Sequence, residues 1–88
     1  MLNPDEHPVA WAMLMHELDD AHEHLGELID RLQRGDPVDE DDFRVDLGHV
    51  YAHLNRAWNG RSDPDAANAS GGTREQRTRF PQDLEPVG

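Results

Sequence analysis

The large hydrophobic residues in the first part of the chain recur at alternating steps of three and four. This spacing keeps one face of an α-helix apolar. The residues that form this face are Trp11, Leu14, Leu18, Ala21, Leu25, Leu28 and Leu32. Pro8 suits the first turn of a helix, where its missing N–H group costs little, and Gly35 can adopt the left-handed conformation that often ends one. We therefore predict a helix over residues 8–34.

The same spacing returns after a short turn at residues 35–37. Its members in this second segment are Phe43, Leu47, Val50, Leu54 and Ala57. Asp39 can cap a helix N-terminus, and acidic residues follow it directly, where the helix dipole favours negative charge. These signals predict a second helix over residues 39–59. Because the connection is short, the two helices should lie antiparallel as a hairpin.

The apolar spacing ends at Gly60. The large apolar residues beyond it are Phe80, Leu84 and Val87, among many small and polar ones. Such a segment cannot bury enough apolar surface to offset the entropy lost on ordering. We therefore expect residues 1–60 to form the helical hairpin domain and residues 61–88 to be a disordered, flexible tail.

The predicted hairpin has more apolar surface than two helices can cover. In a register that places Phe43 opposite Leu32, the first two turns of helix 1 extend about 10 Å beyond helix 2 into water. We therefore predict an all-α fold, an antiparallel two-helix hairpin that dimerises into a four-helix bundle, although higher oligomers stay open. The residues that we assign to the oligomer interface are Trp11, Leu14, Met15, Leu18, His22 and Ile29.

The charge of the chain narrows the choice of partners. Nineteen acidic residues and eight basic ones, all arginine, give a net charge of −11. Such a surface repels nucleic acid and anionic membranes, so we expect neither as a partner. It also leaves an alternative function open, in which the protein mimics nucleic acid and inhibits a basic protein.

Cysteine and long apolar runs are both missing from the sequence. A chain without cysteine forms no disulfide and no thiolate metal site. No run approaches the ~20 apolar residues that a membrane span requires. The sequence therefore predicts a cytoplasmic protein.

The hydroxyl side chains that could serve as nucleophiles all lie in the predicted tail. They are Ser62, Ser70, Thr73 and Thr78. A nucleophile must be held within hydrogen-bond reach of a base, which a disordered segment does not provide. We therefore expect a protein that is not an enzyme, with no catalytic residues and no cofactor.

Metal binding is a second alternative function. Asp46, His49 and His53 lie on one side of the predicted second helix, and imidazole with carboxylate suits zinc, iron, nickel or manganese. A similar row, His16, Asp20, His24 and Glu27, lies on helix 1. Metal-binding bundles place such ligands in their cores, however, and the seam predicted here is wholly apolar. These residues more simply form a solvated polar face, and we assign no metal site.

Two groups of residues have the composition of protein contact surfaces. Tyr51, Asn55, Trp58 and Asn59 form a strip along helix 2 that is rich in aromatic side chains, which such surfaces favour. In the tail, Phe80 and Leu84 could dock into a groove of another protein or fold back over the Trp11 end. We assign these six residues to partner binding. The sequence thus favours a small, non-catalytic interaction or adaptor module that binds itself and an unidentified protein.

Overall fold

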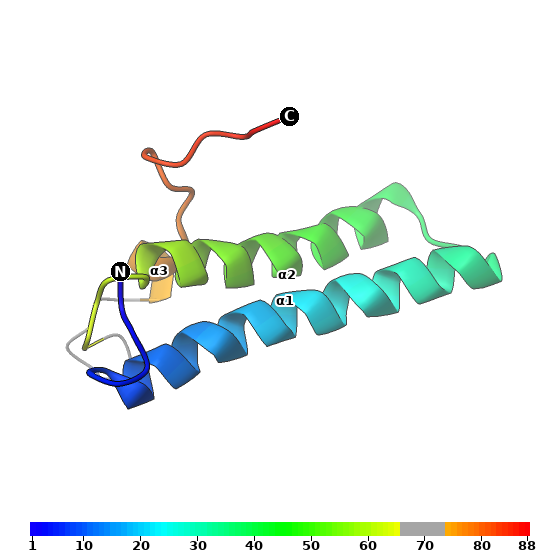
Figure 1. Ribbon diagram of the computed structural model, residues 1–88. Coiled ribbons are helices and arrows are strands. Elements are labelled where there is room, and N and C mark those ends of the chain that lie inside the picture. The colour runs from blue at the N-terminus through cyan, green and yellow to red at the C-terminus, as the bar shows by residue number, and fades with distance from the viewer. Residues whose placement is uncertain (66–73) are drawn as a thin grey trace.

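A computed structural model describes residues 1–65 and 74–88 of the chain. Two long helices, α1 (Pro8–Arg34) and α2 (Glu40–Asn59), run antiparallel as a hairpin (Figure 1). A short helix, α3 (Arg74–Thr78), packs against α2. The described part of the chain contains no strand. The prediction of an all-α helical hairpin is confirmed.

Local sequence signals determine where the two long helices end. Gly35 has a φ of 76°, and the N–H groups of Gly35 and Asp36 donate to the carbonyls of Leu32 and Arg31, which closes α1 with a Schellman motif. The Asp39 carboxylate accepts a hydrogen bond of 2.8 Å from the Asp42 N–H group, which caps α2. Predicted helix 1 covers the same residues as α1, and predicted helix 2 differs from α2 only in including this capping residue.

The seam between α1 and α2 is only in part the one predicted, because Leu14, Ala21, Leu28, Val50 and Ala57 are buried as expected and other predicted members are not. Its buried side chains are Ala10, Leu14, Ala21 and Leu28 from α1 and Val50 and Ala57 from α2. Polar pairs alternate with them, because Glu17 contacts His53 and Arg31 contacts Asp46 across the helices. The prediction of a wholly apolar seam is therefore wrong.

Three of the leucines predicted for the seam on α1 lie instead at its margin. Leu18 is 41% exposed, Leu25 39% and Leu32 49%. They directly follow the polar seam residues Glu17, His24 and Arg31 in sequence. The helix is thus rotated from its predicted orientation, and part of its apolar face remains open.

The N-terminal segment covers the end of α1 that extends beyond α2. The Leu2 side chain is buried, and its N–H group donates a hydrogen bond of 2.8 Å to the Arg61 carbonyl. Ala10 and Leu14 are buried here as well, whereas Val9 stays exposed. The expectation that the whole first two turns stand in water is therefore wrong.

The C-terminal segment differs from the predicted disordered tail. Residues 74–78 form α3, and residues 77–83 make hydrogen bonds to α2 and Arg61. The predicted disorder is thus not confirmed for these residues, while the part of that prediction covering 66–73 lies outside the described residues. No helix in the described ranges is long and apolar enough to cross a membrane.

Candidate interaction surfaces

One side of the hairpin carries an open ridge of leucines. In an antiparallel pair of helices, side chains that follow the seam residues by one position turn away from the seam by the same angle on each helix. They therefore point to the same side of the hairpin. The residues that directly follow the polar seam positions therefore form one continuous surface. This leucine ridge consists of Leu18, Leu25 and Leu32 on α1 and Leu47 and Leu54 on α2. Leu54 is 43% exposed, so the ridge stays accessible on both helices.

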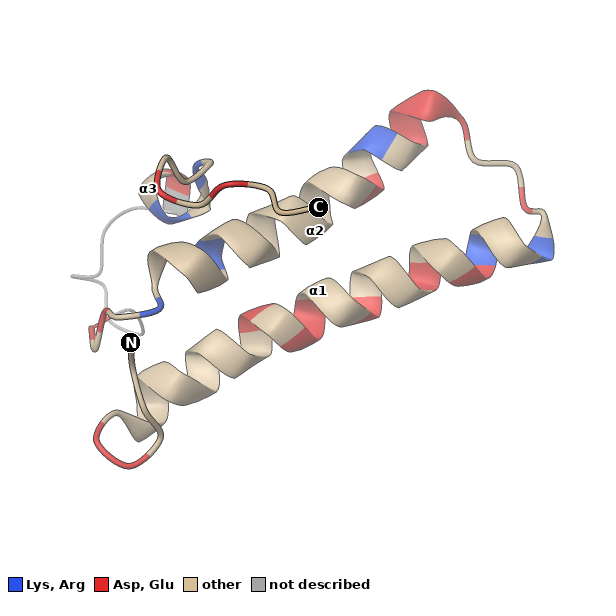
Figure 2. Ribbon diagram, turned by 45° about the horizontal axis from the view of Figure 1, so that its top comes forward, with Lys and Arg blue, Asp and Glu red and all other residues tan. Residues whose placement is uncertain are grey.

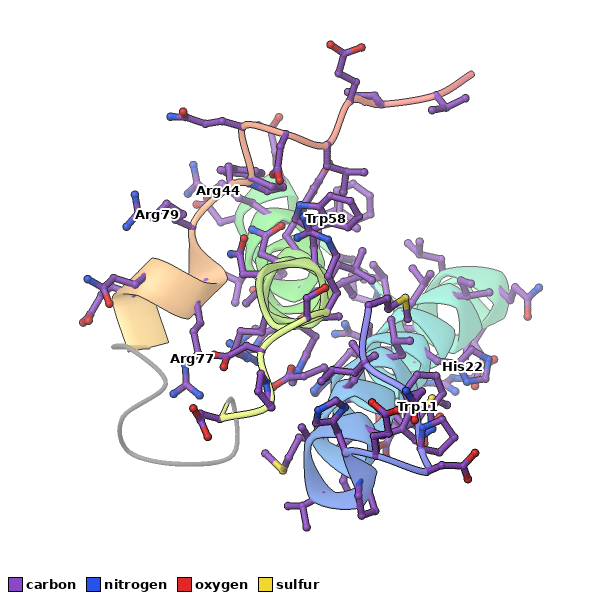
Figure 3. All side chains as sticks on the ribbon, turned by 60° about the vertical axis from the view of Figure 1, so that its left-hand side comes forward. Trp11, His22, Arg44, Trp58, Arg77 and Arg79 are labelled. Carbon is purple, nitrogen blue, oxygen red and sulfur yellow. The ribbon has the colours of Figure 1, made fainter. Side chains whose placement is uncertain are left out.

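Further apolar residues flank the ridge. Met15 and Ile29 are exposed on α1, and Phe43 and Tyr51 are exposed on α2. In the end-on view of Figure 3, Trp11 and His22 project from α1 on the side away from α3. Among the residues assigned to an oligomer interface, Met15, Leu18, His22 and Ile29 are exposed and Trp11 is half-buried, whereas Leu14 is buried inside the hairpin.

The opposite side of the seam is polar and well connected. Glu17 accepts a hydrogen bond of 2.9 Å from Arg56 Nε and lies 2.8 Å from His53 Nδ1, which also contacts Arg56. The His24 ring stacks on His53 with 5.3 Å between centroids and lies 5.8 Å from His49. These side chains form cross-helix contacts.

The three residues of the alternative metal site are already engaged in this network. Asp46 is paired with Arg31, and His53 contacts Glu17 and Arg56. His49 lies beside the His24 ring. Within the described residues, no group of three His, Cys, Asp or Glu side chains is arranged to hold a metal ion. His24 of α1 does converge with His49 and His53 of α2, a contact that was not predicted.

The chain's own C-terminal segment contacts all four residues of the predicted contact strip on α2, and Figure 3 shows it lying beside Trp58. We call Tyr51, Asn55, Trp58 and Asn59 the tail seat. The Asn55 side-chain amide donates to the Thr78 carbonyl at 2.8 Å. The Asn59 amide donates to the carbonyls of Arg77 and Arg79, at 2.6 and 3.1 Å. Both amides thus bind the main chain of the segment, whatever its side chains.

Side-chain contacts supplement these main-chain bonds. The Trp58 indole N–H donates to Asp83 at 2.9 Å, and Arg61 donates to the same carboxylate at 3.2 Å. The Arg61 guanidinium also stacks on the Trp58 ring, 3.7 Å from its centroid. The Trp58 hydrogen bond and, to a smaller extent, Arg61 hold the pKa of Asp83 below its ordinary value. Trp58 and Arg61 therefore form a small carboxylate clamp.

An aromatic contact lies at the other end of the seat. The Phe80 and Tyr51 rings meet edge to face with 5.5 Å between centroids. Leu54, Phe80 and Leu84 line a shallow hollow beside Tyr51. Phe80 remains 69% exposed, so the contact covers only part of its ring.

The six residues assigned to partner binding therefore lie together where the C-terminal segment contacts α2. The predicted alternative of a fold-back is what the structure shows, although the segment lies on α2 and not on the Trp11 end. Sequence reasoning missed Arg61 and Asp83. The signal for Arg61 was its place three residues after Trp58, a spacing that brings two side chains of a helix end together.

The candidate nucleophiles are not activated where the structure describes them. Thr78 Oγ1 accepts a hydrogen bond of 3.3 Å from Arg56, a donor that does not take up its proton. Ser62 is exposed, and Ser70 and Thr73 lie outside the described residues.

Acidic residues are distributed along α1 and concentrate at the turn between the helices (Figure 2).

Comparisons of the chain with family models, with curated proteins and with solved structures found no match.

Proposed function

We propose that the protein is a small, non-catalytic interaction module that works as a homodimeric four-helix bundle. The leucine ridge is the observation that supports this proposal. An exposed, contiguous apolar surface on a small protein marks a site of association. A second hairpin would cover this ridge with an identical one, as a two-fold dimer requires.

The distribution of charge favours a second copy of the same acidic chain as the occupant. The ridge itself carries no charged residue. On α1, Asp20, Glu23, Glu27 and Asp30 lie at helical positions away from it. On α2, Glu40 and Arg44 lie together beside Leu47 at one end of the ridge. The α1 parts of two ridges can therefore meet without bringing their acidic residues face to face.

The apolar area left open is adequate for a dimer of moderate affinity. Full burial of a large apolar side chain contributes ~1.5–3 kcal/mol, so each partly exposed ridge or flank residue has roughly 1 kcal/mol left to gain. Two copies together gain on the order of 15 kcal/mol, against an association cost of about 4–15 kcal/mol. The difference, between zero and about 11 kcal/mol, includes the ~8 kcal/mol that corresponds to a micromolar dissociation constant, which we take as the expected value.

Sedimentation velocity across protein concentrations tests this proposal. We expect the wild-type chain to sediment as a dimer at high concentration. Leu25→Asp places an unpaired carboxylate on each ridge, and we expect it to weaken association by about a hundredfold or more. The matched control is Val45→Asp, because Val45 is also an exposed apolar helix residue but points away from the ridge. A wild-type monomer at high concentration, or equal masses for both variants, would contradict the proposal.

The lack of cysteine suits the reducing cytoplasm, where we place this dimer as part of the proposal. The two alternative functions, metal binding and nucleic-acid mimicry, gain no specific support from the described residues.

A further inference from the structure

The tail seat has the properties of a binding site for an extended peptide. Asn55 and Asn59 donate to three successive main-chain carbonyls, those of Arg77, Thr78 and Arg79. Side-chain amides that bind main-chain carbonyls accept any sequence. Asn55 is buried beneath the segment, although asparagine is normally a surface residue.

Two further contacts add preference for particular side chains. The clamp of Trp58 and Arg61 binds a carboxylate, here that of Asp83. Tyr51 offers a ring edge or face to an aromatic residue, here Phe80. The occupant thus carries an aromatic residue three positions ahead of an acidic one.

We propose that the tail seat binds a partner protein through an extended segment of this chemistry, and that residues 77–84 of the chain occupy the seat until the partner displaces them. The present occupant fits the seat only in part. Phe80 is mostly exposed, and the bond between Trp58 and Asp83 is open to solvent. A partner segment that packs its aromatic residue more fully onto Tyr51 and Leu54 gains contact area over the segment in place.

A second copy of the chain is the less suitable occupant. Its C-terminal segment has the same sequence, so it offers the seat no better contacts. The segment of the same chain has the advantage of an effective concentration on the order of millimolar where the connection is short. Only a segment of different and better-fitting sequence therefore displaces it.

The test uses the full chain and a fluorescent synthetic peptide with the sequence of residues 75–88. The variant Phe80→Ala/Asp83→Ala removes the contacts of the resident segment with Tyr51 and with the carboxylate clamp, and it changes no residue of the hairpin. Its matched control, Glu85→Ala/Val87→Ala, removes an exposed acidic and an exposed apolar residue from the same segment. Circular dichroism verifies that all variants keep the helical hairpin.

We expect the peptide to bind the Phe80→Ala/Asp83→Ala variant about tenfold more tightly than it binds the wild type or the control. This factor assumes that the peptide binds the open seat with a dissociation constant of about 0.1 mM and that the resident segment has an effective concentration of about 1 mM. Adding Asn59→Ala to the opened variant removes two main-chain hydrogen bonds, and we expect binding to weaken at least about fivefold.

Three results would overturn the proposal. In the first, the peptide does not bind the opened variant. In the second, it binds the wild type and the opened variant equally, so that the resident segment does not occupy the seat. In the third, a peptide with Phe80→Ala and Asp83→Ala binds as tightly as the original, which removes the preference for those side chains. Tyr51 and Leu54 border both the tail seat and the leucine ridge, so peptide binding is measured at a protein concentration at which sedimentation shows the monomer.

Discussion

Glu17 is the acidic residue whose removal should cost the hairpin most. Its side chain is 22% exposed and lies between Arg56 and His53, which are 13% and 14% exposed. Replacing Glu17 by alanine leaves the Arg56 guanidinium partly buried without its main acceptor. A charged hydrogen bond contributes about 1.5–3 kcal/mol, and an unpaired buried charge costs more.

We therefore expect Glu17→Ala to lower the free energy of unfolding by about 2–4 kcal/mol. For a domain of this size, this corresponds to a decrease in melting temperature of roughly 10–20 °C. Glu17→Gln should cost about half as much, because the glutamine Oε1 atom can still accept a hydrogen bond from Arg56.

Urea denaturation followed by circular dichroism measures these differences. All variants are compared at one protein concentration, because dimerisation would make the apparent stability depend on it. The matched control is Glu23→Ala, which removes the same charge from an exposed position of α1 and should change stability by less than about 0.5 kcal/mol. If Glu17→Ala and Glu23→Ala have equal stabilities, the loss of Glu17 leaves no costly unpaired charge on Arg56 and the reasoning is refuted.

Further predictions concern two glycines, the cap of α2 and the carboxylate clamp. Gly26→Ala should stabilise the chain by roughly 0.5–1 kcal/mol in the same urea assay, because alanine favours a helix and the added Cβ meets nothing within 4 Å. Gly35→Ala should instead cost about 1–2 kcal/mol, because Gly35 has a φ of 76°, which a residue with a Cβ adopts only with strain. Asp39→Ala removes the cap of α2 and should cost about 1 kcal/mol, visible as a lower midpoint. The pKa of Asp83 is lower when the C-terminal segment is docked, so the bond between Asp83 and Trp58 stabilises docking above pH 3.8 and is lost as the pH falls below that value. Trp58 fluorescence should show this change in the wild type but not in Asp83→Asn.

The ends of the helices could be predicted because the signals for them are local. Pro8, Gly35 and Asp39 act on their own backbone neighbours, so their roles are independent of how the helices pack. Residues 8–34 were predicted as one helix on this basis. The antiparallel arrangement of the helices could also be predicted, because a short turn leaves the second helix little freedom in how it packs against the first.

The rotation of each helix could not be predicted from apolar spacing. On α1 the apolar arc runs from Leu28 through Leu25 to Ile29, which is wider than a single neighbouring helix can cover. Which part of the arc faces α2 depends on Glu17 and Arg56, residues 39 positions apart in the sequence. Such distant pairs leave no periodic pattern, so the leucines themselves appeared to be the seam.

The docking of the C-terminal segment likewise could not be predicted from the amino-acid composition. Asn55 and Asn59 bind main-chain carbonyls, which every residue possesses, so the sequence of residues 77–79 bears no mark of the contact. Only the side-chain contacts of Phe80 and Asp83 are specific. Phe80 was accordingly recognised as an anchor, whereas its site on α2 was not.

The division between a polar seam and an open leucine ridge has a consequence for assembly. Charged pairs between helices contribute little net stability but reject wrong registers, because a slip leaves a charge unpaired. Apolar contacts contribute more free energy but specify register weakly. In a dimer, the polar pairs Glu17–Arg56 and Arg31–Asp46 would set the alignment within each hairpin, and the ridge would hold two aligned hairpins together. Exchanging the two roles, with leucines inside a hairpin and charged pairs between copies, would leave each hairpin free to slip and each interface weak.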